Sequence, residues 1–152
     1  MESESKCPEQ VVSAIAQHID MGMVCFLNTD TFEFESVLGN SYNASEDEDF
    51  REYYQEVYGK VDSWKSHIRI APPEPWESFK IMERFIQNCI LDGDGLKERL
   101  WRAISGRKPF RYFKSVIDES RYRQCWFDFK QKQLEQFVTD YLCSQETGMS
   151  AE

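Results

Sequence analysis

The sequence lacks the features that mark several large classes of protein. No apolar run approaches the roughly 18 residues needed to cross a bilayer, and the polar start over residues 1–6 does not fit a secretory signal. The five cysteines are odd in number and scattered, without a C-x-x-C pair, so we expect reduced thiols. We therefore expect a cytoplasmic protein without a membrane anchor or a disulfide framework.

The residues that usually carry catalysis are also few. The two histidines, His18 and His67, lie far apart, and neither stands in a nucleophile elbow or an H-E-x-x-H motif. The glycine patterns G-x-x-x-x-G-K-[ST] and G-x-G-x-x-G, which hold phosphates, are absent. We therefore expect no catalytic residues, no metal site and no cofactor, although an enzyme with an unrecognised site stays open as an alternative.

What is present indicates one folded domain. The chain has 152 residues, of which 41% are hydrophobic and 14% aromatic, enough to build a core. The first half mixes two periodicities. Apolar residues with helical or alternating spacing predict a short helix over 8–19, an antiparallel hairpin within 21–37, a helix from Ser45 to Gly59, and a third strand over 64–70 that pairs with the hairpin. In the helix expected from Ser45 to Gly59, Ser45 and Glu48 form a capping box and Gly59 ends the helix. Its apolar stripe includes Tyr53, Tyr54 and Tyr58.

The second half is helical. After the rigid segment 71–75, the apolar residues predict helices over 79–90, 96–105, 109–117 and 122–142, with Phe110 and Phe113 facing inward in the third. The fold class is therefore α+β and mostly helical, with a small antiparallel sheet packed with a helical C-terminal half. We expect a single domain over 1–143, divided into a mixed half (8–70) and a helical half (76–143), and a disordered tail over 144–152.

Charge is distributed unevenly along the chain. The net charge is −9, but residues 97–132 hold eleven basic and four acidic residues, so this stretch carries +7 and the rest of the chain −16. Four of the bases gather around the start of the helix at Pro109, where free N–H groups and the helix dipole favour anions. They are Arg107, Lys108, Arg111 and Lys114. We predict a site for an anion or a charged partner there. The alternative is that these bases are solvated, or paired with the acids of the other half or of a second copy in a homodimer.

Three segments of the second half resemble a known family. They are F-x-I-M-E-x-F-I over 79–86, G-x-x-P-F-x-x-F-K over 106–114, and the W-x-x-F formed by Trp126 and Phe129. Together they are similar to a bacterial family known only as uncharacterised protein family one-five-eight, over about residues 68–142. The resemblance implies a bacterial cytosolic protein of no established activity, so it supplies no site residues.

Three functions fit these observations. The first is a non-enzymatic module that binds or regulates a protein partner, because no catalytic set is recognisable while aromatics are abundant. The second is a binder of nucleic acid or a phosphate ligand through 107–114, where aromatic residues interleave with bases. The third is an enzyme with an unrecognised site, which needs a deep pocket with titratable groups.

Overall fold

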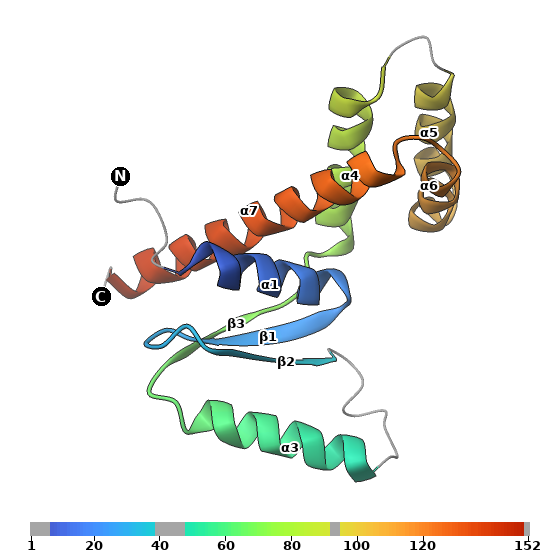
Figure 1. The fold of residues 1–152 in the computed structure, drawn as a ribbon. Helices are drawn as coiled ribbons and strands as arrows, with labels where there is room; N and C mark the ends of the chain where they lie inside the picture. The colour runs from blue at the N-terminus through green and yellow to red at the C-terminus, as the bar shows by residue number, and fades with distance from the viewer. Residues whose placement is uncertain (1–6, 39–47, 92–94, 151–152) are drawn as a thin grey trace. The chain divides into compact units, whose positions relative to one another are not determined.

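A computed structural model describes residues 7–38, 48–91 and 95–150 of the chain (Figure 1). The fold is α+β and mostly helical, as the sequence predicts. Among the described residues, no helix is both long enough and apolar enough to span a bilayer. The helices are α1 (Glu9–Asp20), α3 (Glu48–Asp62), α4 (Pro75–Cys89), α5 (Leu96–Ser105), α6 (Pro109–Asp118) and α7 (Arg123–Ser150), and the strands are β1 (Met23–Asn28), β2 (Phe34–Leu38) and β3 (His67–Ile70).

The chain forms two compact units. Unit 1 consists of Met1–Pro72 and Leu134–Glu152, and unit 2 consists of Pro73–Gln133. Helix α7 therefore contributes its first part to unit 2 and its last part to unit 1. The backbone of α7 is helical as far as Ser150, whereas we expected a disordered tail from residue 144. The helix can continue because, once it has started, each added residue gains a backbone hydrogen bond. A single domain over 1–143 stays a prediction.

The sheet of unit 1 has the order β2-β1-β3, and both pairings are antiparallel. Val24 pairs with Val37 across the hairpin, and Cys25 pairs with Ile70 on the other side of β1. The hairpin and the pairing of the third strand are thus confirmed. The hairpin turns at Asn28, whose side-chain oxygen accepts hydrogen bonds from the backbone N–H groups of Asp30 and Thr31, at 2.8 and 3.2 Å.

One face of the sheet packs against α3. Because side chains alternate along a strand, the register places Val24, Phe26 and Val37 on the same face. These residues form a buried cluster with three residues of α3, Tyr54, Val57 and Val61. The Tyr54 hydroxyl also donates a hydrogen bond to the backbone oxygen of Leu38 at 3.3 Å.

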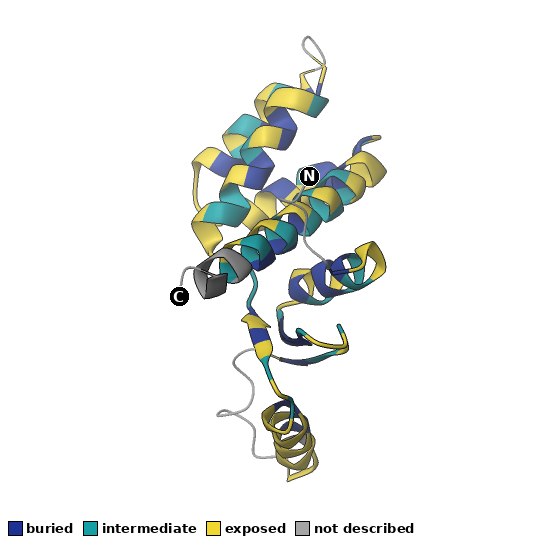
Figure 2. Ribbon diagram, turned by 90° about the vertical axis from the view of Figure 1, so that its left-hand side faces the viewer, coloured by how far each residue is buried: buried dark blue, intermediate teal, exposed yellow. Residues whose placement is uncertain are grey.

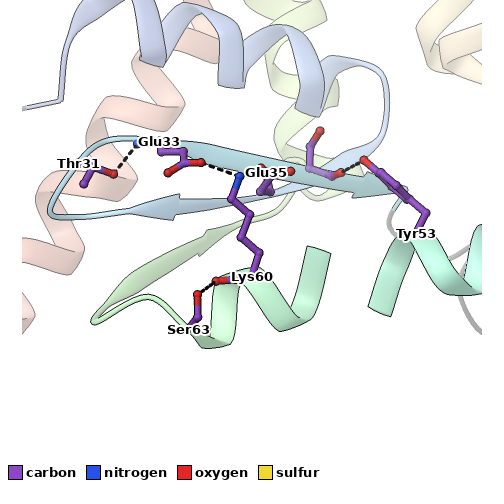
Figure 3. Close-up of polar contacts among 7 residues, drawn as sticks. Thr31, Glu33, Glu35, Tyr53, Lys60 and Ser63 are labelled. Atoms are coloured by element: carbon purple, nitrogen blue, oxygen red, sulfur yellow. Dashed lines mark hydrogen bonds and ion pairs between the residues drawn. The ribbon is translucent and has the colours of Figure 1, made fainter. Parts of the chain in front are cut away.

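The end of α3 differs from our expectation. Gly59 does not end the helix, which continues to Asp62. The extra turn places Val61 in the buried cluster, and this burial offsets the weak helix propensity of glycine. The capping box of Ser45 lies outside the described residues. Lys60, in the last turn of α3, forms ion pairs with Glu33 and with Glu35 of β2, at 2.6 and 2.7 Å. These contacts join α3 to the hairpin (Figure 3).

The opposite face of the sheet carries α1 (Figure 1). Ile15 and Ile19 of α1 are buried, as are Cys25 and Ile70 of this sheet face. His18 Nδ1 lies 2.8 Å from the hydroxyl oxygen of the buried Ser36, which ties α1 to β2. The last part of α7 completes unit 1 and buries Leu134, Val138 and Leu142.

Unit 2 is built around an aromatic cluster. The ring of Phe85 from α4 lies 5.2 Å from Trp126 and 6.4 Å from Phe113, measured between ring centroids. Phe129 joins the same cluster, 5.4 Å from Phe85. Our expectation that Phe110 faces inward was wrong, because its side chain is 43% exposed. Helical periodicity predicts on which side of the helix a residue lies, but not whether another element covers that side along its whole length. Phe110 lies in the first turn of α6, before the turns in which Phe113 and Ile117 are buried.

The cysteines should differ sharply in reactivity. Cys25 is fully buried, and burial raises the pKa of its thiol to about 12, whereas Cys125 is exposed. Only the thiolate reacts with alkylating agents, so iodoacetamide at pH 8 should label Cys125 in the native protein and Cys25 only after denaturation. Peptide mass spectrometry at timed intervals measures both rates. Equal rates in the native state would contradict the burial of Cys25.

Candidate functional site

The candidate site lies in unit 2, between α5 and α6. Residues 106–108 join these two helices, which pack against each other. Lys108 adopts a left-handed backbone conformation with φ 51°, and Pro109 after it disfavours the right-handed helical region at this position. Pro109 is the first residue of α6, where its missing N–H leaves no helical hydrogen bond unmade.

An open hollow of about 390 Å³ lies along this helix pair. We call it the α5–α6 hollow. It is lined by Arg99, Arg102, Ala103, Gly106, Arg107, Tyr112, Ser115 and Val116. A second hollow of about 350 Å³ adjoins it at the start of α5, shares Arg99, and also includes Arg121 and Tyr122.

The local sequence explains why these side chains meet. Leu96, Leu100 and Ile104 of α5 are buried. Arg99 and Arg102, three residues apart, lie outside this buried stripe on an exposed side of the same helix. Tyr112 lies on the corresponding side of α6 and faces the same hollow. The small residues Ala103 and Gly106 leave the space between them open.

The hollow is strongly basic. Arg99, Arg102 and Arg107 are exposed, and its lining contains no acidic residue. Within the described residues, no ion pair or hydrogen bond engages these three guanidinium groups. Guanidinium stays charged at every physiological pH and binds carboxylate or phosphate through two parallel hydrogen bonds. The arrangement is therefore suited to bind an anion rather than to hold the fold together.

The four bases predicted from the sequence do not act as one group. Arg107 lines the hollow, whereas Lys108, Arg111 and Lys114 are exposed and are not part of the lining. Lys114 is bound to Asp118, with its Nζ 2.7 Å from the carboxylate, and this bond together with Arg123 lowers the pKa of the Asp118 carboxyl. An anion or partner site formed by all four bases stays a prediction. Of the four, Arg107 is the one that lines the α5–α6 hollow.

Sequence reasoning did not single out Arg99, Arg102 and Tyr112 as site residues. The two arginines belong to the basic stretch, but on a helix by themselves they are indistinguishable from a solvated face. The signal that bears on them is their spacing, because residues three apart on a helix are neighbours on its surface and can act together. Ala103, a small residue on the same side, is a second sign.

The lining offers little chemistry beyond binding. It holds no carboxylate, imidazole or thiol, so it has no general acid or base that titrates near neutral pH. Among the described residues, no group of three or more histidine, cysteine, aspartate and glutamate side chains is placed to hold a metal ion. What the hollow presents to a ligand is positive charge and an aromatic ring.

Comparisons with known proteins place the chain in a family. No curated protein and no solved structure shows a significant match to it. The model of an uncharacterised protein family (UPF0158) matches residues 37–152, which include α3 and both helices of the hollow. This match extends beyond the segment 68–142 that carries the motif resemblance. Because it covers well over half of the chain, the protein belongs to this uncharacterised family.

Proposed function

We propose that the protein is a non-enzymatic interaction module that binds an acidic segment of a protein partner in the α5–α6 hollow. One observation carries this proposal. Three arginines and a tyrosine line a single open hollow that contains no acidic residue. We propose further that it acts in the bacterial cytoplasm, as the family resemblance and the free cysteines suggest.

The composition of the hollow supports a protein partner. Arginine, tyrosine and tryptophan are the residues most enriched among those that dominate binding energy at protein interfaces. Tyr112 is 50% exposed beside Arg107, and Phe110 is exposed in the same turn of α6. An acidic segment with an apolar residue would satisfy both the guanidinium groups and these rings.

The net charge of −9 weighs against nucleic acid as the main ligand. A polyanion is repelled at long range by a protein of the same sign, although a local basic patch can overcome this at low salt. A short acidic peptide carries less charge and is affected less. The basic stretch 97–132 nevertheless makes nucleic acid the second candidate, and the experiment below separates the two. The enzyme alternative needs titratable groups that the lining of the hollow lacks.

Fluorescence anisotropy with two labelled probes tests the proposal. The probes are a ten-residue glutamate peptide and a fifteen-nucleotide thymidine DNA strand. We expect the peptide to bind, and to bind more weakly as salt rises from 50 to 300 mM. Arg99→Glu/Arg102→Glu should reduce its affinity at least about tenfold, because each substitution replaces an attraction by a repulsion.

The matched control is Lys80→Glu/Lys132→Glu. It makes the same change in net charge at two exposed positions of unit 2 outside the hollow, and it should keep the affinity within about twofold. Equal losses in both double variants would mean that net charge, and not the hollow, governs binding. Tighter binding of DNA than of peptide, lost in Arg99→Glu/Arg102→Glu, would replace the protein partner by nucleic acid. If neither probe binds, the proposal is wrong.

A further inference from the structure

The outer face of α3 carries a stripe of carboxylates. Glu48, Glu52 and Glu56 follow one another at intervals of four residues, so they lie on one side of the helix, and all three are exposed. Figure 2 shows much of α3 in the colour of exposed residues. Tyr54 and Val57 are buried on the side that faces the sheet. The stripe therefore points away from the core of unit 1.

These carboxylates differ from the two that α3 approaches beside β2, Glu33 and Glu35, which form ion pairs. Glu33 and Glu35 share an ion pair with Lys60, whose Nζ lies 2.6 and 2.7 Å from their carboxylates (Figure 3). Within the described residues, no ion pair or hydrogen bond engages the side chains of Glu48, Glu52 and Glu56. Like charges spaced four apart on a helix repel each other. A row of cations brought against this face would relieve that repulsion.

The stripe and the α5–α6 hollow match in charge and in length. At 1.5 Å per helical residue, Glu48 to Glu56 spans about 12 Å, and Arg99 to the end of α5 at Ser105 spans about 9 Å. The hollow presents three guanidinium groups to three carboxylates. A helix laid along a groove with its charged face inward is a recurrent way of recognising a partner.

We propose that α3 of one copy of the chain docks in the α5–α6 hollow of a second copy. This inference rests on the proposed function and names the acidic segment that the hollow binds. Each chain carries one stripe and one hollow, so two copies related by a two-fold axis make the contact twice. The second contact then forms within an existing complex, which raises its effective concentration and strengthens a pairing that is weak singly.

A charge exchange between two variants tests the dimer. Variant one is Glu52→Lys/Glu56→Lys, and variant two is Arg99→Glu/Arg102→Glu. Glu48 is kept, because a cation in the first turn of α3 would oppose the helix dipole. Sedimentation velocity should show a wild-type dimer at 50 µM in 50 mM salt that dissociates in 500 mM salt, and each variant alone should be monomeric.

Mixing the two variants should restore a dimer. The lysines of variant one then face the glutamates of variant two, while the native stripe and the native hollow face each other in the second contact. Lys80→Glu/Lys132→Glu should stay dimeric. Circular dichroism checks that both variants are folded, and Glu52→Gln/Glu56→Gln, which only removes charge, serves as a milder second variant if the lysine variant is not.

Three results would overturn this inference. They are a wild-type protein that is monomeric at every concentration, a dimer that survives in both variants, and folded variants whose mixture stays monomeric. The proposed function can be judged separately. A monomeric protein that still binds the glutamate peptide through Arg99 and Arg102 keeps the proposed function, while the partner is then not a second copy.

Discussion

Replacing Phe85 by alanine is expected to lower the free energy of unfolding of unit 2 by about 3–5 kcal/mol, the range for truncating a buried phenylalanine. Phe85 is fully buried, and its ring lies against those of Phe113, Trp126 and Phe129. The substitution leaves a cavity among three rings that cannot close around it without moving helices α6 and α7. A loss of this size is a large part of the total stability of an ordinary domain.

Phe110→Ala is the matched control for this prediction. It removes the same atoms from a side chain that is 43% exposed in the same unit, so we expect a loss below about 1 kcal/mol. Urea titration followed by tryptophan fluorescence measures both variants, since three of the four tryptophans, including Trp126 of the cluster, lie in unit 2. Similar losses in the two variants would show that the aromatic cluster is not the core of unit 2.

Tyr54→Ala should have an effect of similar size in unit 1. Tyr54 is 1% exposed, packs with Phe26 and Val57, and donates a hydrogen bond to the Leu38 backbone. Its truncation removes the main residue by which α3 holds the sheet, and we expect a loss of about 3–5 kcal/mol. Hydrogen exchange measured by mass spectrometry should then show faster exchange in α3 and β2.

Tyr54→Phe separates packing from hydrogen bonding. It keeps the ring and removes only the hydroxyl, so we expect a loss of about 0.5–1.5 kcal/mol. The exchange pattern of Tyr54→Ala also tests the predicted single domain. If the two units unfold together, exchange rises equally in α4, α5 and α6, whereas independent units confine the change to unit 1. An unchanged α3 in Tyr54→Ala would refute the packing of this helix on the sheet.

Much of the fold could be predicted from the sequence, because its signals are local. The end of α5 before Gly106 and the start of α6 at Pro109 follow from the backbone preferences of these two residues. The hairpin and the third strand follow from alternation of apolar residues. The prediction that Gly59 ends α3 was wrong because a glycine ends a helix only when no tertiary contact stabilises the next turn. Here the burial of Val61 stabilises that turn.

The site was harder to predict because it depends on how two helices pair. Arg107 could be predicted, but Arg99 and Arg102 join it only because α6 lies beside α5. Lys114 was chosen by its position near Pro109, although Asp118, four residues later on the same helix, already binds it. That pairing is a local signal, and the i to i+4 spacing was sufficient to find it.

The division of α7 between the two units has a consequence for biosynthesis. Unit 2 is one uninterrupted stretch, Pro73–Gln133, whereas unit 1 needs residues from both sides of that stretch. Leu134, Val138 and Leu142 leave the ribosome only after every residue of unit 2 has been made. The inserted unit can therefore fold while the nascent chain is still growing, and the unit that begins first is completed last. The middle of the sequence can then fold before its two ends come together. If translation stalls after residue 133, unit 1 lacks the last part of α7 and is incomplete.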